Sequence, residues 1–128
     1  MTYITLFEEG VSAWFSSFVW EDDSYKISVE DYLLERPKTT ICVRVKGDSM
    51  IWAWIMRNDL VLVDTSINPK IWDIVIAIFD WVYTIKYLCT DKSWKTFLRS
   101  ANKDYPDAYP KDSLSIFWVV VAVIRKYI

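Results

Sequence analysis

The chain has 128 residues and no histidine, and this absence removes several kinds of active site at once. A Ser-His-Asp triad, a Cys-His pair and any histidine-bound metal centre are excluded. Only two cysteines are present, Cys42 and Cys89, so a thiolate zinc site or a disulfide framework is not indicated. We expect both to be small buried core residues. Hydrolytic chemistry would therefore need lysine, aspartate or glutamate to activate a nucleophile.

An excess of positive charge is also missing. Lys and Arg total 15 against 17 Asp and Glu, and no basic cluster stands out. Because neutralising phosphates needs clustered Lys and Arg, direct nucleic-acid binding is not expected. The first residues include Glu8 and Glu9, unlike a signal peptide, and the most apolar run, 114–124, is too short to cross a membrane. These features favour a cytoplasmic protein of one domain.

Glycine is scarce and tryptophan is abundant, with 2 Gly and 8 Trp. Average usage would give roughly nine glycines in a chain of this length. Trp81 follows Asp80 where Asp-Gly would be the usual hairpin signal. Some genetic codes read UGA as glycine and others as tryptophan, so translation with the wrong code would exchange the two. Most or all of these residues are therefore predicted to be glycine in the natural protein: Trp14, Trp20, Trp52, Trp54, Trp72, Trp81, Trp94 and Trp118. The alternative is a genuinely Trp-rich protein whose indoles form a core or a binding surface.

Periodicity predicts a mainly β protein. Ser28 and Asp31 form a capping box that begins a helix at residues 29–35, and Pro37 ends it. Alternating or apolar runs predict strands at residues 3–7, 39–46, 59–64, 73–79, 82–89, 95–99 and 115–127. We expect an all-β domain over residues 28–128, with one short helix, after an extended N-terminal arm over residues 1–27.

A candidate nucleophile follows the first strand of this domain. Gly47 and Asp48 predict a tight turn that leads to Ser49, where a helical turn can begin. Free backbone N–H groups there, with Gly47, Asp48 and Met50 shaping the turn, could build an oxyanion hole beside the hydroxyl. The alternative is that Ser49 only caps the next helical turn.

Lys86 is the candidate base for Ser49. It lies in a strand that is apolar on both faces and therefore belongs inside a sheet. Its ammonium either reaches out to solvent at an edge or is buried. Burial would lower its pKa, and a neutral amine near pH 7 is a competent general base. Ser–Lys pairs are a known variant of the serine nucleophile–base arrangement.

Five segments in order resemble one family. They are VRVKGDSMI at 43–51, NDLVLVD at 58–64, WDIVIA at 72–77, YTIK at 83–86 and FWVV at 117–120. Together they are similar to the self-cleaving LexA/UmuD family, peptidases of the S24 class, and to its UmuD-like members most closely. Lys86 follows Ser49 at a distance of 37 positions, which is similar to the family's spacing.

The resemblance implies a function. Members cleave themselves in the N-terminal arm between a small residue and glycine, which places the scissile bond here at Ala13-Trp14, 36 residues before Ser49, with Trp14 where the family has glycine. It implies a homodimer, stimulation by a RecA filament on single-stranded DNA, and a UmuC-like translesion DNA polymerase as partner. No cofactor or metal is implied.

Two alternatives remain open. Repressors of the family carry a helix-turn-helix domain before the arm, and the 12 residues ahead of Ala13 leave no room for one, which favours the UmuD-like interpretation. A stand-alone S24 peptidase or repressor-like C-terminal domain that regulates transcription is one alternative. The other is a catalytically inactive β domain that serves only as a binding module.

Overall fold

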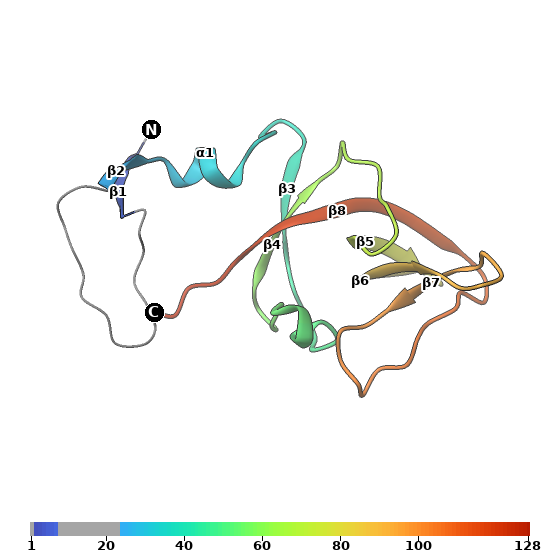
Figure 1. Cartoon of the computed structure of the whole chain (residues 1–128). Helices are drawn as coiled ribbons and strands as arrows, with labels where there is room; N and C mark the ends of the chain where they lie inside the picture. Colours follow the sequence, from blue (N-terminus) through green and yellow to red (C-terminus); the bar gives the residue numbers. More distant parts are fainter. Residues whose placement is uncertain (1, 8–23) are drawn as a thin grey trace. The chain divides into compact units, whose positions relative to one another are not determined.

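The structure, a computed structural model, describes residues 2–7 and 24–128 (Figure 1). The chain divides into two compact units, residues 1–35 and 36–128. The predicted scissile residues Ala13 and Trp14 lie outside the described residues, as does Trp20. The boundary of the cleavable arm therefore stays a prediction.

The N-terminal unit contains a strand pair and the one described α-helix. Strand β1 (Ile4–Phe7) pairs antiparallel with β2 (Ser24–Ile27), a strand that the sequence pattern did not predict. Helix α1 (Val29–Leu33) begins as expected, with the Ser28 hydroxyl accepting the Asp31 N–H at 3.4 Å. With five residues it is too short to span a membrane, and no other described helix can do so.

The second unit is a six-stranded antiparallel sheet in the order β3-β4-β8-β5-β6-β7. Its members are β3 (Thr40–Arg44), β4 (Leu60–Asp64), β5 (Ile74–Phe79), β6 (Val82–Thr90), β7 (Thr96–Arg99) and β8 (Leu114–Ile124). The long β8 joins the β3-β4 pair to the β5-β6-β7 meander (Figure 1). A 3-10 turn, η1 (Ile51–Ala53), lies between β3 and β4. This architecture confirms the all-β fold class.

Both faces of β5 are buried, which explains its continuous apolar run. Ile76 belongs to one core cluster, together with Met50, Ile55 and Val61, whereas Val75 belongs to a second cluster on the other face. The first cluster joins β4, β5 and the segment that carries η1, so burial of Met50 and Ile55 fixes this segment to the sheet.

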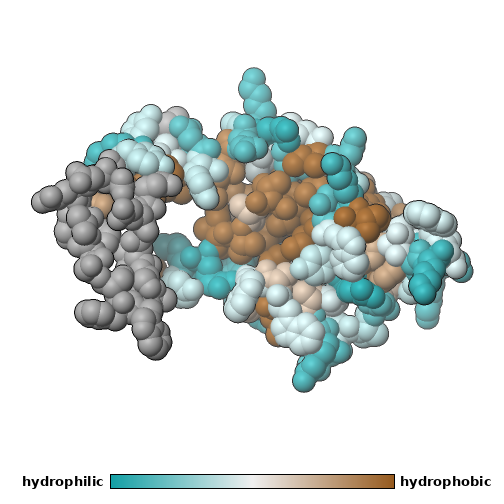
Figure 2. Space-filling view, viewed as in Figure 1, coloured by the Kyte–Doolittle hydropathy of each residue, from teal (hydrophilic) through white to brown (hydrophobic). Residues whose placement is uncertain are grey.

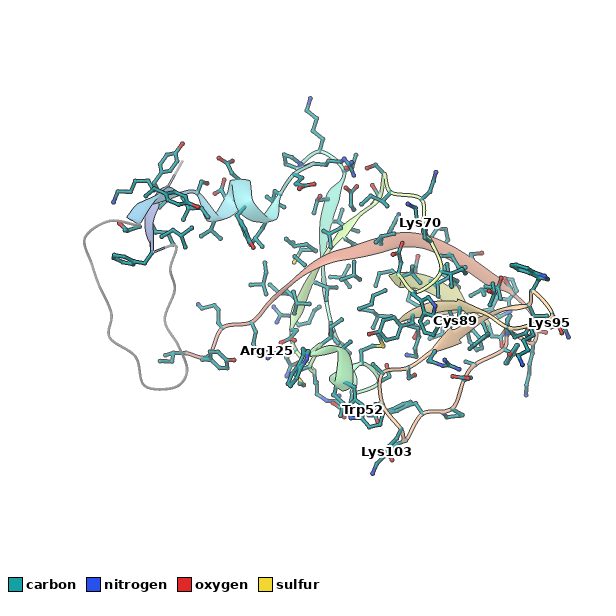
Figure 3. All side chains as sticks on the ribbon, viewed as in Figure 1. Trp52, Lys70, Cys89, Lys95, Lys103 and Arg125 are labelled. Carbon is teal, nitrogen blue, oxygen red and sulfur yellow. The ribbon has the colours of Figure 1, made fainter. Side chains whose placement is uncertain are left out.

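The two cysteines differ. Cys89 is buried inside the sheet, as expected (Figure 3). The expectation that Cys42 is buried is wrong, because β3 is an edge strand and Cys42 is exposed there. An apolar strand need not have both faces covered when it ends a sheet.

Backbone torsions bear on the tryptophan question. Four of the six described tryptophans have a φ between 61° and 75°, in the left-handed region that glycine favours and bulky residues avoid. They are Trp54, Trp72, Trp81 and Trp94. Asp80 and Trp81 both have positive φ between β5 and β6, as the Asp-Gly type of hairpin turn requires. The backbone therefore favours glycine at these positions, and the exchange stays a prediction.

Replacing Trp54 by glycine is expected to raise the free energy of unfolding by about 1 kcal/mol, because it removes left-handed strain at the end of η1. Little packing is lost, since Trp54 is 74% exposed. Trp52 is the matched control: it lies in the same turn at negative φ and is 61% exposed. Trp52→Gly is expected to lower stability by about 0.5–1 kcal/mol. Denaturant unfolding measures both changes, and equal effects would refute the strain argument.

The codons of the gene test the exchange directly. UGA at most of the eight tryptophan positions is expected, and UGG at these positions would refute the prediction. Peptide masses of the protein purified from its source give a second reading, since glycine and tryptophan residues differ by about 129 Da.

Candidate functional site

The turn before Ser49 depends on a glycine. Gly47 has φ +129°, which residues with a Cβ rarely adopt, while an added Cβ there would meet no atom within 4 Å. The constraint is therefore conformational rather than one of space. The Val45 N–H donates to the Asp59 carbonyl at 2.8 Å, and the Asn58 N–H donates to the Val45 carbonyl at 2.9 Å. These bonds continue the β3-β4 pairing up to the turn.

The segment after Ser49 is anchored by Met50. Its side chain is 1% exposed, and its carbonyl accepts the N–H groups of Ala53 and Ile55. The capping alternative for Ser49 is wrong, because η1 is capped at Met50 without a side-chain hydrogen bond. The expected stabilisation of an oxyanion by a helix dipole is also not supported, because η1 has only three residues and few aligned peptide dipoles. Within the described residues, the Ser49 N–H donates to no acceptor, so it remains available to a ligand. The Met50 N–H also donates to no acceptor, but Met50 is buried.

Lys86 lies on β6, inside the sheet, and reaches Ser49. Its Nζ is 2.7 Å from Ser49 Oγ, 2.9 Å from Thr84 Oγ1 and 3.1 Å from the Ile85 carbonyl oxygen, and it donates to each. The structure thus brings together the two residues that the sequence proposed as nucleophile and base. Thr84 was missed, although its place two residues before Lys86 on one strand was a usable signal.

Burial lowers the pKa of the Lys86 amine from its ordinary value of 10.5. Its three hydrogen-bond acceptors are two hydroxyls and a carbonyl, none of them charged. A carboxylate partner would stabilise the ammonium and raise the pKa, and none of these acceptors does that. The same 2.7 Å separation lets the Ser49 hydroxyl donate to the neutral amine once Lys86 has lost its proton.

A groove of about 400 Å³ opens at this pair. Its lining includes Val43, Val45 and Lys46 from β3 and its extension, and Tyr83, Thr84 and Ile85 from β6. Arg44, Val61, Ile76 and Trp118 complete the lining together with Ser49 and Lys86. The walls are mostly apolar with few polar groups, which suits an extended peptide segment. If residue 118 is glycine in the natural protein, the groove is wider by one indole.

Asp48 lies in the turn between Gly47 and Ser49, with its side chain exposed. Asp48 forms an exposed ion pair with Arg57 at 3.1 Å, which contributes little to stability. Within residues 2–7 and 24–128, no group of three His, Cys, Asp or Glu side chains could hold a metal ion.

These features define a serine–lysine site in a mainly β domain, and the family follows from comparison with known proteins. The Peptidase S24-like family model matches residues 5–121. The chain belongs to this family, and the resemblance seen in the sequence is confirmed.

Three relatives illustrate the range of the family. Protein SamA of Salmonella typhimurium is 36% identical over 94% of this chain and 84% of its own length. Protein ImpA of Escherichia coli is 31% identical over 94% of this chain and 83% of its own length. The LexA repressor of Acetivibrio thermocellus is 39% identical over 69% of this chain, but this match covers 41% of the repressor.

The lowered pKa of Lys86 can be measured by NMR on protein carrying ¹³C-labelled lysine. We expect one lysine signal to titrate below 10.5, because burial disfavours its charged form. Lys86→Met assigns the signal by removing it. A Lys86 signal that titrates at or above 10.5 would contradict the description of the site.

Proposed function

We propose that the chain is a self-cleaving serine peptidase of the UmuD-like kind, with Ser49 as nucleophile and Lys86 as general base. The observation that carries the proposal is the 2.7 Å contact between Lys86 Nζ and Ser49 Oγ, made by a lysine whose pKa is lowered by burial. Membership of the S24-like family supports peptidase chemistry in general.

The reaction requires a neutral Lys86. Its amine takes the proton of the Ser49 hydroxyl while Ser49 Oγ bonds to the carbonyl carbon of Ala13. Backbone N–H groups near Ser49, among them its own, stabilise the resulting oxyanion. When the bond between Ala13 and residue 14 breaks, the Lys86 ammonium gives its proton to the leaving amine. Water then attacks the ester, with Lys86 again accepting a proton, and Ser49 is regenerated.

The apolar groove would hold the arm segment around Ala13 beside Ser49. Ala13 is small enough to approach a hydroxyl held at a turn. The family resemblance points to the bond after it, and glycine at position 14 would complete the family pattern.

The partners follow the UmuD-like interpretation. A RecA filament on single-stranded DNA would favour the cleavable arm conformation, and the truncated form, as a homodimer, would join a UmuC-like translesion polymerase in the cytoplasm. SamA and ImpA match 94% of this chain, whereas the LexA repressor matches 69%, which supports the UmuD-like interpretation. Figure 2 shows apolar surface over the middle of the β domain. Ile41 on β3 and Val121 and Val123 on β8 are exposed apolar residues that would suit a dimer interface.

Intact-mass measurement of purified protein tests the dyad. At alkaline pH the wild-type chain is expected to lose its first 13 residues. Ser49→Ala and Lys86→Met are each expected to slow this loss by about a thousandfold or more, because each removes one half of the nucleophile–base pair. Ser93→Ala and Lys95→Met change exposed residues of the same types and serve as matched controls. Cleavage that survives in either dyad variant would refute the assignment, and a stable wild type would favour the binding-module alternative.

The cleavage rate is expected to rise with pH and to level off above the pKa of Lys86, below 10.5. The rate rises with pH because only the neutral Lys86 amine accepts the Ser49 proton. The fraction of neutral amine grows until the pH passes the pKa of Lys86. First-order rates between pH 6 and 11 measure the profile. A rate that does not depend on pH would exclude Lys86 as the base.

A further inference from the structure

Asn102 lies in the loop after β7 and contacts the nucleophile turn. It is one of the few buried polar residues of the described chain, with 7% exposure. Its Nδ2 donates to the Asp48 carbonyl at 2.8 Å, across 54 residues of sequence. Its Oδ1 accepts the Asp104 N–H at 3.0 Å. Because one end of the amide faces a carbonyl and the other faces an N–H, only one orientation satisfies both partners.

This bond acts on the peptide that precedes the nucleophile. In a planar trans peptide the carbonyl and the N–H point in opposite directions. Holding the Asp48 carbonyl on Asn102 therefore directs the Ser49 N–H away from Asn102. That N–H donates to no acceptor in the described residues, and Ser49 itself lines the groove.

The other contacts between this loop and the turn act further along the chain. The Trp52 N–H donates to the Ala101 carbonyl at 2.8 Å, and the Ala101 N–H donates to Met50 Sδ at 3.4 Å. Trp52 and Lys103 accordingly lie at the same end of the domain in Figure 3. Among the described residues, Asn102 alone holds the carbonyl of Asp48.

We propose that Asn102 is a positioning residue for the oxyanion hole: it orients the Asp48-Ser49 peptide so that the Ser49 N–H meets the negative charge that develops on the scissile carbonyl. The proposal rests on the proposed function of Ser49. Asn102 does not line the groove and shares no hydrogen bond with Lys86, so it acts through the peptide that it orients. A donor that is fixed before the reaction stabilises the oxyanion more than one that must reorient during it.

Asn102→Asp tests the proposal with little change of volume. The variant keeps an oxygen for the Asp104 N–H and replaces the donor to the Asp48 carbonyl by an acceptor. We expect the plateau of the self-cleavage rate at high pH to fall at least about tenfold, since losing one oxyanion donor entirely costs 10²–10³-fold. The added carboxylate can itself raise the pKa of Lys86, so the apparent pKa is compared in Asn102→Ser, which adds no charge and should keep the wild-type value.

Asp64→Asn is the matched control. Asp64 is also buried, at the end of β4, where it accepts hydrogen bonds from Ser66, Thr39 and Arg36, so the change weakens contacts outside the site. Its plateau rate should remain within about twofold of the wild type. If Asn102→Asp does not fold, Asn102→Ser removes the same donor without adding charge and should lower the plateau in the same way.

The outcomes separate the two proposals. If the wild type cleaves and the folded Asn102 variants reach the same plateau rate at high pH, the role of Asn102 is overturned and the proposed function is not. A shifted pKa with an unchanged plateau would also overturn it, because the effect would then act through Lys86. A wild-type chain that never cleaves would overturn the proposed function and this inference together.

Discussion

The hydrogen bond between Lys86 and Ser49 is the constraint on which the site depends. A lysine inside a sheet is costly when charged, and this one has only uncharged acceptors, so burial shifts it toward the neutral amine. In a chain without histidine, this lowering of the pKa makes Lys86 the candidate base of the site. Burial of Lys86 on an interior strand is thus also the physical cause of its proposed chemistry.

The other half of the site is a turn held from several sides. Gly47 permits the backbone to reverse, Met50 fixes the turn to the core, and Asn102 holds the peptide before Ser49. The residue after β8 adds a further support, since Arg125 forms an ion pair with buried Asp59 at 2.6 Å and also donates to the Trp54 carbonyl (Figure 3). Ser49 is therefore presented by a rigid frame although it lies on a loop, which is what catalysis at a defined distance requires.

The sequence predicted the sheet well because local patterns determine it. The expected ranges located seven of the eight described strands, mostly from alternating or apolar runs, and Asp80 with Trp81 located the hairpin between β5 and β6. The exposure of Cys42 was missed because strand order depends on long-range pairing, and nothing in the run from 39 to 46 shows that it lies at an edge. Asn102 was missed because its partner is 54 residues away, and a single asparagine in a loop has no periodicity.

Labelling of Ser49 by a fluorophosphonate probe tests most directly whether Lys86 activates it, because the probe reports on the hydroxyl without needing the arm as substrate. In the wild type we expect a labelled peptide containing Ser49, with a labelling rate that rises with pH. In Lys86→Met, which nearly keeps the length of the side chain but has no amine, we expect almost no labelling. Equal labelling of Ser49 in the wild type and in Lys86→Met would contradict activation of Ser49 by Lys86.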